Sequence, residues 1–187
     1  MVGLGAIGLL HVRMAKACGA RVIAVGRRRE RLQLAAVLGA DAVVDTEEDP
    51  VPESVRELTA GVGPDVVIEC TGSPTIWVEA PGWAARGGRV VLFAGLAAGT
   101  SVAFDATRLH YDEVDIINAF HFRPADVEEA HRLLATGVID VRPIITGVKE
   151  LSSIVDVFAS LDRGNGVKYA ILPTLNGADG PEATAWA

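Results

Sequence analysis

The chain has 187 residues, 50% of them hydrophobic, and a formal net charge of −7. This length suffices for one well-packed domain or a small pair of domains. The acidic balance argues against a nucleic-acid partner, because the only basic concentration, Arg27–Arg29 with Arg31, is large enough for one phosphate but too small to follow a phosphate backbone. No apolar stretch approaches the length of a membrane span, so we expect no membrane partner.

The two cysteines indicate the compartment. Cys18 falls on an expected helix and Cys70 at an expected strand end, so neither a disulfide framework nor a metal knuckle is visible. A reduced, cytoplasmic setting fits this pattern best.

The first element in chain order is a glycine-rich turn that reads Gly3-Leu4-Gly5-Ala6-Ile7-Gly8, a G-x-G-x-x-G pattern. In a Rossmann unit the first glycine makes the strand-to-helix turn, the second lets the backbone approach a pyrophosphate, and the third lets helix pack on strand. An apolar, glycine-rich opening is also typical of a signal peptide. However, no Lys or Arg precedes the turn, and the pattern becomes that of an amphipathic helix at His11 and Arg13.

Strands and helices then alternate along the chain. Short β-branched runs predict strands at residues 21–25, 42–44, 65–69, 89–94, 116–119 and 167–172. Amphipathic stretches bounded by helix-breaking residues predict helices at residues 29–38, 52–60, 75–85, 124–137 and 151–161. This order predicts an α/β fold with a doubly wound parallel sheet in one domain, residues 1–172. The polar, glycine-rich residues 173–187 are expected to form a disordered tail.

The end of the second strand predicts the cofactor. A dinucleotide-binding unit that takes NAD usually has Asp or Glu at this place, to bind the ribose 2′-hydroxyl. Here the position is Gly26, followed by Arg27 and Arg28, whose guanidinium groups are suited to a 2′-phosphate. The sequence therefore predicts NADP(H) in preference to NAD(H). The alternative is a solvated helix start, with Glu30 as the local partner of these arginines.

The ends of two later strands predict further contacts with the cofactor. In an open parallel sheet, ligands lie beyond the carboxyl ends of the strands. Thr71 and Gly72 follow one strand, and Ala94, Gly95 and Leu96 follow the next. We expect these residues to border the cofactor, although glycine at a strand end is also common in ordinary turns.

Several ordered motifs resemble one known family. They are, in chain order, G-L-G-A-I-G-L-L, L-G-A-D, D-V-V-I-E-C-T-G, G-G-R-V-V-L-F-A-G, L-H-Y and L-L-A-T-G-V-I-D-V-R-P-I-I-T. Together, from Val2 to Leu172, they look like the cofactor-binding half of zinc-dependent medium-chain alcohol and polyol dehydrogenases. The resemblance implies a Rossmann fold whose first strand is largely missing and whose N-terminal catalytic domain is absent. It also implies hydride transfer between NADP(H) and a secondary alcohol, polyol or ketone in a full-length form, with no indication of which substrate.

The resemblance assigns roles to individual positions. It implies that the Ala6 and Ile7 amides face the pyrophosphate, and that Gly26 with Arg28 forms the adenosine 2′ site. The positions whose main-chain groups it places around the nicotinamide carboxamide are Ala94, Asn118 and Phe120. The position it assigns to a basic residue that reaches the pyrophosphate is Lys168.

Zinc is expected only in the missing N-terminal domain, because the zinc ligands of this family come mainly from there. The histidines do not form a ligand cluster with either cysteine at zinc-site spacing; they are His11, His110, His121 and His131. Asp65 and Glu69 are not a credible acid/base pair. We therefore predict no catalytic residue and no metal ligand in this chain. The alternative function is a non-catalytic nucleotide-binding module, or a truncated remnant without activity.

Stability and association are predicted from the sheet. Loss of about four buried strand residues would cost about 1.5–3 kcal/mol each. The chain would then be only marginally stable, because the typical free energy of unfolding is about 5–15 kcal/mol. Either the start is misassigned, or the chain needs a partner.

Residues 101–104 and 116–119 are expected at a sheet edge that the resembling family pairs across a two-fold axis, which implies a homodimer. Aggregation is the alternative outcome.

Overall fold

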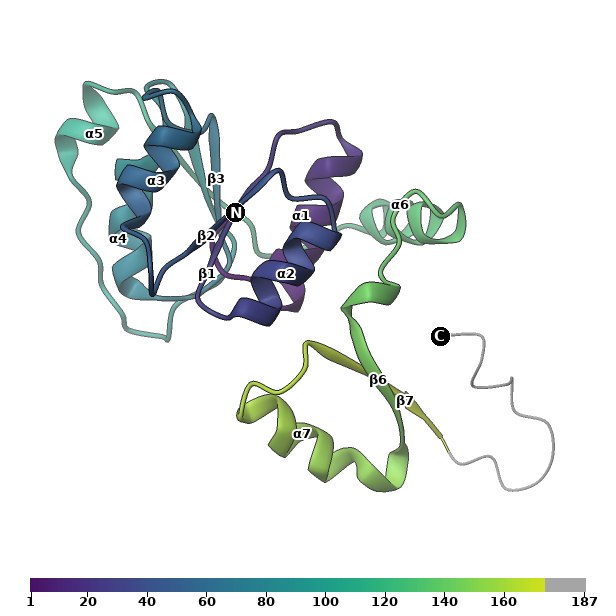
Figure 1. Cartoon of the computed structure of the whole chain (residues 1–187). Coiled ribbons are helices and arrows are strands. Elements are labelled where there is room, and N and C mark those ends of the chain that lie inside the picture. The colour runs from purple at the N-terminus through teal and green to yellow at the C-terminus, as the bar shows by residue number, and fades with distance from the viewer. Residues whose placement is uncertain (174–187) are drawn as a thin grey trace. The chain divides into compact units, whose positions relative to one another are not determined.

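The computed structural model describes residues 1–173, which fall into two compact units (Figure 1). The first unit is Met1–Ile139, and the second begins at Asp140. The sequence pattern predicts one domain over residues 1–172, and that domain assignment stays a prediction.

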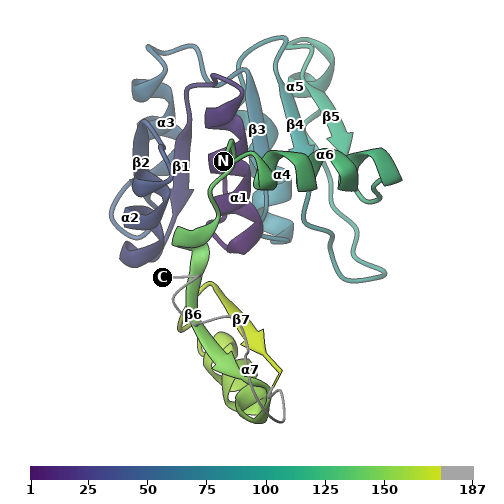
Figure 2. The same cartoon turned by 90° about the vertical axis from the view of Figure 1, so that its right-hand side faces the viewer.

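The first unit is built around a parallel sheet. Its strands are β1 (Ile23–Gly26), β2 (Ala42–Asp45), β3 (Val66–Glu69), β4 (Arg89–Leu92) and β5 (Asp115–Asn118). β1 pairs with β2, and β3, β4 and β5 pair in that order, all in parallel. Val2 forms parallel bridges to Val25 of β1 and to Glu69 of β3, and so joins the two halves. Figure 2 shows the N-terminus between β1 and β3. With this short central segment counted first, the strand order is that of a Rossmann sheet.

The central segment, Met1–Gly3, supplies hydrogen bonds on both sides. Toward β1, Val25 N donates to Met1 O (2.8 Å) and Gly3 N donates to Val25 O (3.0 Å). Toward β3, Val2 N donates to Ile68 O (2.9 Å), and Cys70 N donates to Val2 O (2.8 Å). Val2 itself is buried in the core. Met1–Gly3 therefore occupies the central position of the sheet and completes the hydrogen-bond ladder between β1 and β3.

Helices cover both faces of this sheet, as expected for a doubly wound fold. Figure 1 shows α1 (Ala6–Ala17) and α2 (Arg29–Val37) on one face, and α3 (Val51–Leu58) and α4 (Pro74–Trp83) on the other. Two further helices, α5 (Ala106–His110) and α6 (Pro124–Ala135), follow β4 and β5. The helices and strands predicted in this unit are confirmed to within a few residues at their ends; α5 was not predicted. The core is made mainly of the β-branched strand residues and α4 side chains, among them Val25, Val44, Val67, Val90 and Trp83.

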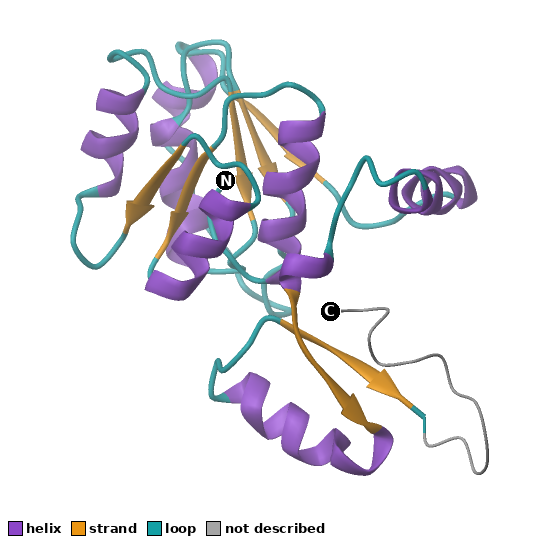
Figure 3. Cartoon of the chain, turned by 45° about the vertical axis from the view of Figure 1, so that its right-hand side comes forward, coloured by secondary structure: helices purple, strands orange, loops and turns teal. Residues whose placement is uncertain are grey.

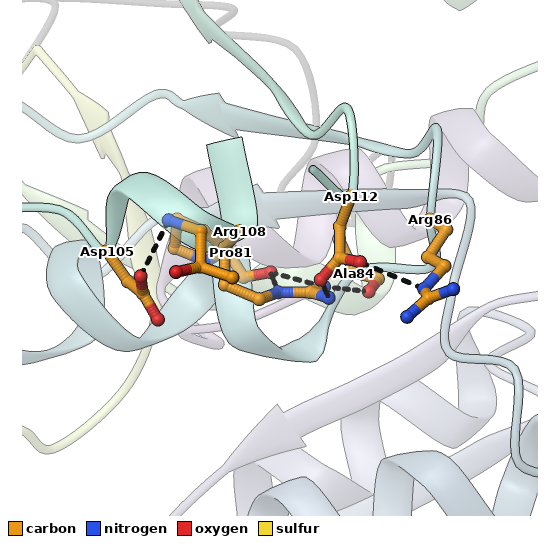
Figure 4. A network of polar contacts seen from close by, with 7 residues as sticks. Pro81, Ala84, Arg86, Asp105, Arg108 and Asp112 are labelled. Carbon is orange, nitrogen blue, oxygen red and sulfur yellow. Dashed lines mark hydrogen bonds and ion pairs between the residues drawn. The ribbon is translucent and has the colours of Figure 1, made fainter. Parts of the chain in front are cut away.

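The short helix α5 is held against the end of α4 by Arg108 (Figure 4). The guanidinium group donates to Pro81 O (3.2 Å from Nε and 3.0 Å from Nη2) and to Ala84 O (2.7 Å). It also pairs with Asp112, which Arg86 contacts at 2.9 Å from the other side. These carbonyls lie at the C-terminal end of α4, where a helix leaves acceptors without intrahelical partners. Arg108 therefore caps α4 from a distant part of the sequence.

The second unit is a small β-α-β arrangement (Figure 3). It contains two short 3-10 helices, Arg142–Ile144 and Leu151–Ser153, and the elements β6 (Ile145–Glu150), α7 (Ile154–Asp162) and β7 (Lys168–Leu172). β6 and β7 pair in parallel in a sheet of their own. The strand predicted at residues 167–172 is confirmed as β7, but its expected place as the sixth strand of the main sheet is wrong, because it pairs with β6. The reason is the unpredicted β6, whose sequence ITGVKE mixes a glycine and charges into its β-branched run.

Two expectations concern the remaining residues and the membrane. The tail predicted for residues 173–187 lies, from residue 174 onward, outside the described residues. In the part of the chain that the structure describes, no helix combines the length and the apolar character needed to span a bilayer.

Candidate functional site

Two glycines of the first turn are required by close contacts. Gly3 has a φ of +88°, and a Cβ there would lie 2.7 Å from Thr71 Cγ2. A Cβ on Gly8 would lie 1.8 Å from the carbonyl oxygen of Gly3. Gly5 differs, since a Cβ there would meet nothing within 4 Å. Neighbouring atoms thus crowd Gly3 and Gly8, whereas the space beside Gly5 is open. A ligand could approach the backbone at Gly5.

The N-terminus of α1 opens from this turn. Gly5 is the N-cap residue and offers no side-chain cap, and the first turn holds no acidic residue. Ile7 is 51% exposed, so the start of the helix is accessible. Main-chain N–H groups at a helix start, together with the helix dipole, favour an anion. This geometry suits the pyrophosphate role predicted for the Ala6 and Ile7 amides.

The end of β1 lies beside the same turn. A Cβ on Gly26 would come within 2.9 Å of Leu4 Cδ1. Arg27 is exposed, and Arg28 is the N-cap residue of α2. Gly26 is therefore packed against the glycine-rich turn, and the arginines that follow it start α2 at the same edge of the sheet.

Arg31 also belongs to this region, although it was not predicted as a site residue. Its Nη1 donates to Leu4 O (3.0 Å), so the guanidinium reaches from α2 to the glycine-rich turn. Burial lowers the pKa of Arg31 from its usual value, the positive charge of Arg28 lowers it further, and Glu30 acts in the opposite direction. The clue in the sequence was its spacing, one helical turn after Arg27 and Arg28.

The turns after β3 and β4 touch each other. Gly72 has a φ of +68°, and a Cβ there would lie 3.1 Å from Gly95 O and 3.6 Å from the Cβ of Ala94. Thr71 and Gly95 are exposed, and Leu96 is half-buried. The structure thus brings together the predicted residues at these two strand ends.

Glu69 holds this region from inside. Its side chain is completely buried. One carboxylate oxygen accepts hydrogen bonds from the Thr71 hydroxyl, Thr71 N (2.5 Å) and Gly72 N (3.1 Å), and the other accepts one from Trp77 Nε1 (3.1 Å). The sequence did not indicate Glu69 as an acid or base, nor any other role for it. A carboxylate surrounded by donors is instead an acceptor that fixes the turn.

The remaining predicted site residues have different surroundings. Ala94 N donates to Glu69 O (3.1 Å) and Ala94 O accepts from Trp77 Nε1 (3.0 Å), so both main-chain groups of Ala94 are engaged. Asn118 ends β5 and is exposed, and the Phe120 side chain is 89% exposed. Lys168 begins β7 in the second unit and is exposed, so its pyrophosphate role stays a prediction.

Cys70 lies behind the glycine-rich turn and is not set up as a nucleophile. Its Sγ lies 3.9 Å from His11 Nδ1 and 3.9 Å from Met1 Sδ, and the His11 ring packs edge-on against Phe93. Burial raises the pKa of the thiol to about 12, and the charge of Glu69 contributes in the same direction. The residues that the structure describes contain no group of three or more His, Cys, Asp or Glu placed to hold a metal ion. No zinc-dependent step is therefore assigned to them.

Comparison with known proteins identifies the class. Residues 6–136 match the family model for zinc-binding dehydrogenases. This match spans more than half of the chain. The glycine-rich turn, the strand order and the strand-end turns of the chain are those of a Rossmann domain. The chain belongs to the zinc-binding dehydrogenase family and corresponds to its cofactor-binding half, which carries the nicotinamide cofactor site.

The similar proteins are about twice as long. The chain is 29% identical to a sorbitol dehydrogenase of Halalkalibacterium halodurans, over 92% of this chain and 51% of that protein. It is 33% identical to the D-arabitol-phosphate dehydrogenase of Enterococcus avium, over 91% and 49%. An alcohol dehydrogenase structure from Aeropyrum pernix matches with a TM-score of 0.78 at 30% identity, covering 90% of this chain and 47% of that one. The chain thus spans about half the length of the curated relatives it matches.

Proposed function

We propose that this chain binds NADP(H) in preference to NAD(H) and serves as the cofactor-binding half of an oxidoreductase. The observation that carries the proposal is the end of β1. Gly26 is packed against Leu4, so an Asp or Glu at this position would force Leu4 to move. The carboxylate that would accept a hydrogen bond from the 2′-hydroxyl of NAD is absent at this position. Arginines follow the glycine that stands there instead.

The charges around Gly26 support a phosphate in place of a hydroxyl. Arg27 and Arg28 follow it directly, and Arg31 reaches the glycine-rich turn from the next helical turn. Guanidinium groups bind phosphate with two parallel hydrogen bonds, and each charge-assisted bond contributes about 1.5–3 kcal/mol. One or two such bonds to the 2′-phosphate would give about tenfold to a thousandfold discrimination between the cofactors.

The test is a titration of the purified chain with NADPH and with NADH, followed by intrinsic fluorescence or calorimetry. We expect the wild type to prefer NADPH, and Arg28→Ala to lose most of that preference with NADH binding little changed. Arg21→Ala removes an exposed arginine just before β1 and is the matched control, with no expected change. Equal affinities of the wild type for the two cofactors would contradict the proposal.

The reaction proposed for the complete enzyme is hydride transfer between NADP(H) and a secondary alcohol, polyol or ketone. The relatives named above are a sorbitol dehydrogenase and a D-arabitol-phosphate dehydrogenase, which supports a small hydroxylated substrate. In this proposal the substrate is selected by the half of the relatives that this chain does not match. The free thiols of Cys18 and Cys70 support a reducing, cytoplasmic setting.

A further inference from the structure

Trp77 of α4 connects the two strand-end turns of the candidate cofactor site. Its indole Nε1–H is shared between Glu69 Oε2 (3.1 Å) and Ala94 O (3.0 Å). Glu69 lies at the end of β3, and Ala94 lies just after β4. A single N–H group therefore links a buried carboxylate in one turn to a main-chain carbonyl in the other.

The rest of the same network fixes the partners of that N–H group. The main-chain carbonyl of Glu69 accepts from Phe93 N (3.0 Å) and Ala94 N (3.1 Å). The Glu69 carboxylate accepts from both amides of the Thr71-Gly72 turn. Ala94 is thus held at its N–H by β3 and at its carbonyl by Trp77, which leaves little freedom in the direction of that carbonyl.

The direction of the Ala94 carbonyl matters for the proposed cofactor. A carbonyl oxygen has two lone pairs, and the indole occupies one of them. The second remains for a donor from the ligand. The carboxamide NH₂ of nicotinamide is such a donor, and a fixed acceptor costs less entropy on binding than a mobile one.

We propose that Trp77 is a positioning residue for the nicotinamide half of the cofactor, acting through the Ala94 carbonyl. This inference rests on the proposed function, because it requires a nicotinamide dinucleotide in the site. It concerns a residue outside the glycine-rich turn and the arginines, which bind the adenosine and pyrophosphate parts. The two halves of the ligand should therefore respond differently when Trp77 is changed.

The decisive variant is Trp77→Phe, which keeps an aromatic ring and removes the N–H donor. We expect it to weaken NADPH binding about three- to tenfold, the effect of losing one neutral hydrogen bond. Binding of adenosine 2′,5′-bisphosphate, which has no nicotinamide, should stay within about twofold of the wild type. The measured quantity is the ratio of the two dissociation constants, and a general loss of stability would not change that ratio.

The matched control is Trp83→Phe on the same helix. Trp83 is buried in the core at 8% exposure, so this change should lower the melting temperature and leave the ratio unaltered. A Trp77→Phe chain that loses both ligands equally, or neither, overturns the positioning role while the proposed function stands. A wild type that binds neither ligand overturns the proposed function, and this inference with it.

A second measurement uses the wild-type chain and needs no stable Trp77 variant. The sequence holds three tryptophans, so the indole N–H signal of Trp77 can be assigned in a proton–nitrogen correlation spectrum by elimination with Trp83→Phe and Trp186→Phe. We expect NADPH to shift this signal and adenosine 2′,5′-bisphosphate to leave it in place. Equal shifts with both ligands, or no shift when NADPH is bound, would overturn the inference.

Discussion

At the scale of single residues, the glycines of the first turn have two different structural roles. Gly8 is fixed by packing, because its Cα faces the Gly3 carbonyl at a distance that leaves no room for a methyl group. Gly5 is not fixed in this way, since the space beside it is open. The same motif thus contains one glycine that is needed for folding, Gly8, and one that leaves room for a ligand beside the backbone, Gly5.

This difference gives a prediction. Gly8→Ala should lower the free energy of unfolding by at least about 3 kcal/mol, because a backbone carbonyl must move. Gly5→Ala should cost about 1 kcal/mol or less, as a weaker N-cap residue, yet reduce dinucleotide affinity about tenfold or more by crowding the pyrophosphate. Urea unfolding and cofactor titration of both variants would check this. Loss of stability in Gly5→Ala equal to that in Gly8→Ala would contradict it.

At the scale of elements, Arg108 holds α5 to the end of α4, and its replacement provides a second prediction. Arg108→Lys keeps the charge near Asp112 but cannot reach both the Pro81 and Ala84 carbonyls. We expect a loss of about 2–4 kcal/mol in the free energy of unfolding, because buried acceptors lose their donors. Arg86→Lys is the control. That side chain is 84% exposed, and its ion pair should matter little. Equal urea midpoints for the two variants would argue against this role.

The elements also show which parts of the structure the sequence could predict. The strand Val66–Glu69 begins with three β-branched residues, and its residue pattern and the helix- and strand-breaking residues around it are local signals. β6 was missed because Gly147 and Lys149 interrupt its pattern, and its pairing with β7 then went unnoticed. Trp77 and Arg108 were missed for a different reason. Their hydrogen-bond partners lie in other elements of the fold, so no local sequence pattern predicts these contacts.

At the scale of the whole molecule, the main sheet has two edges, β2 and β5. An edge strand presents unpaired main-chain groups that a second chain can pair with. On β5 the Ile117 side chain is 39% exposed, and on β2 the Val43 side chain is 43% exposed. The predicted homodimer uses β5, so the two edges should respond differently to a charge.

Light scattering of the freshly purified chain tests this prediction. The wild type should have the mass of two chains, and Ile117→Lys should have the mass of one, because a buried ammonium at the paired edge is costly. Val43→Lys places the same charge on the opposite edge and should leave the dimer intact. A well-folded wild-type monomer would exclude the dimer. Mass that grows with time would instead support aggregation.

The short central strand also makes folding sensitive to pH in a chain with a free α-amino group at Met1. That group donates to Ile23 O (2.8 Å) inside the sheet, and burial lowers its pKa from 8.0 to about 6, with Cys70 acting in the opposite direction. Between these values the unfolded chain binds more protons, so stability should rise with pH from 6 to 8, by about 2–3 kcal/mol in total. Urea midpoints across this range would show the rise. An N-acetylated chain keeps every histidine but should lack this part of the slope, and identical slopes in the two chains would refute the linkage.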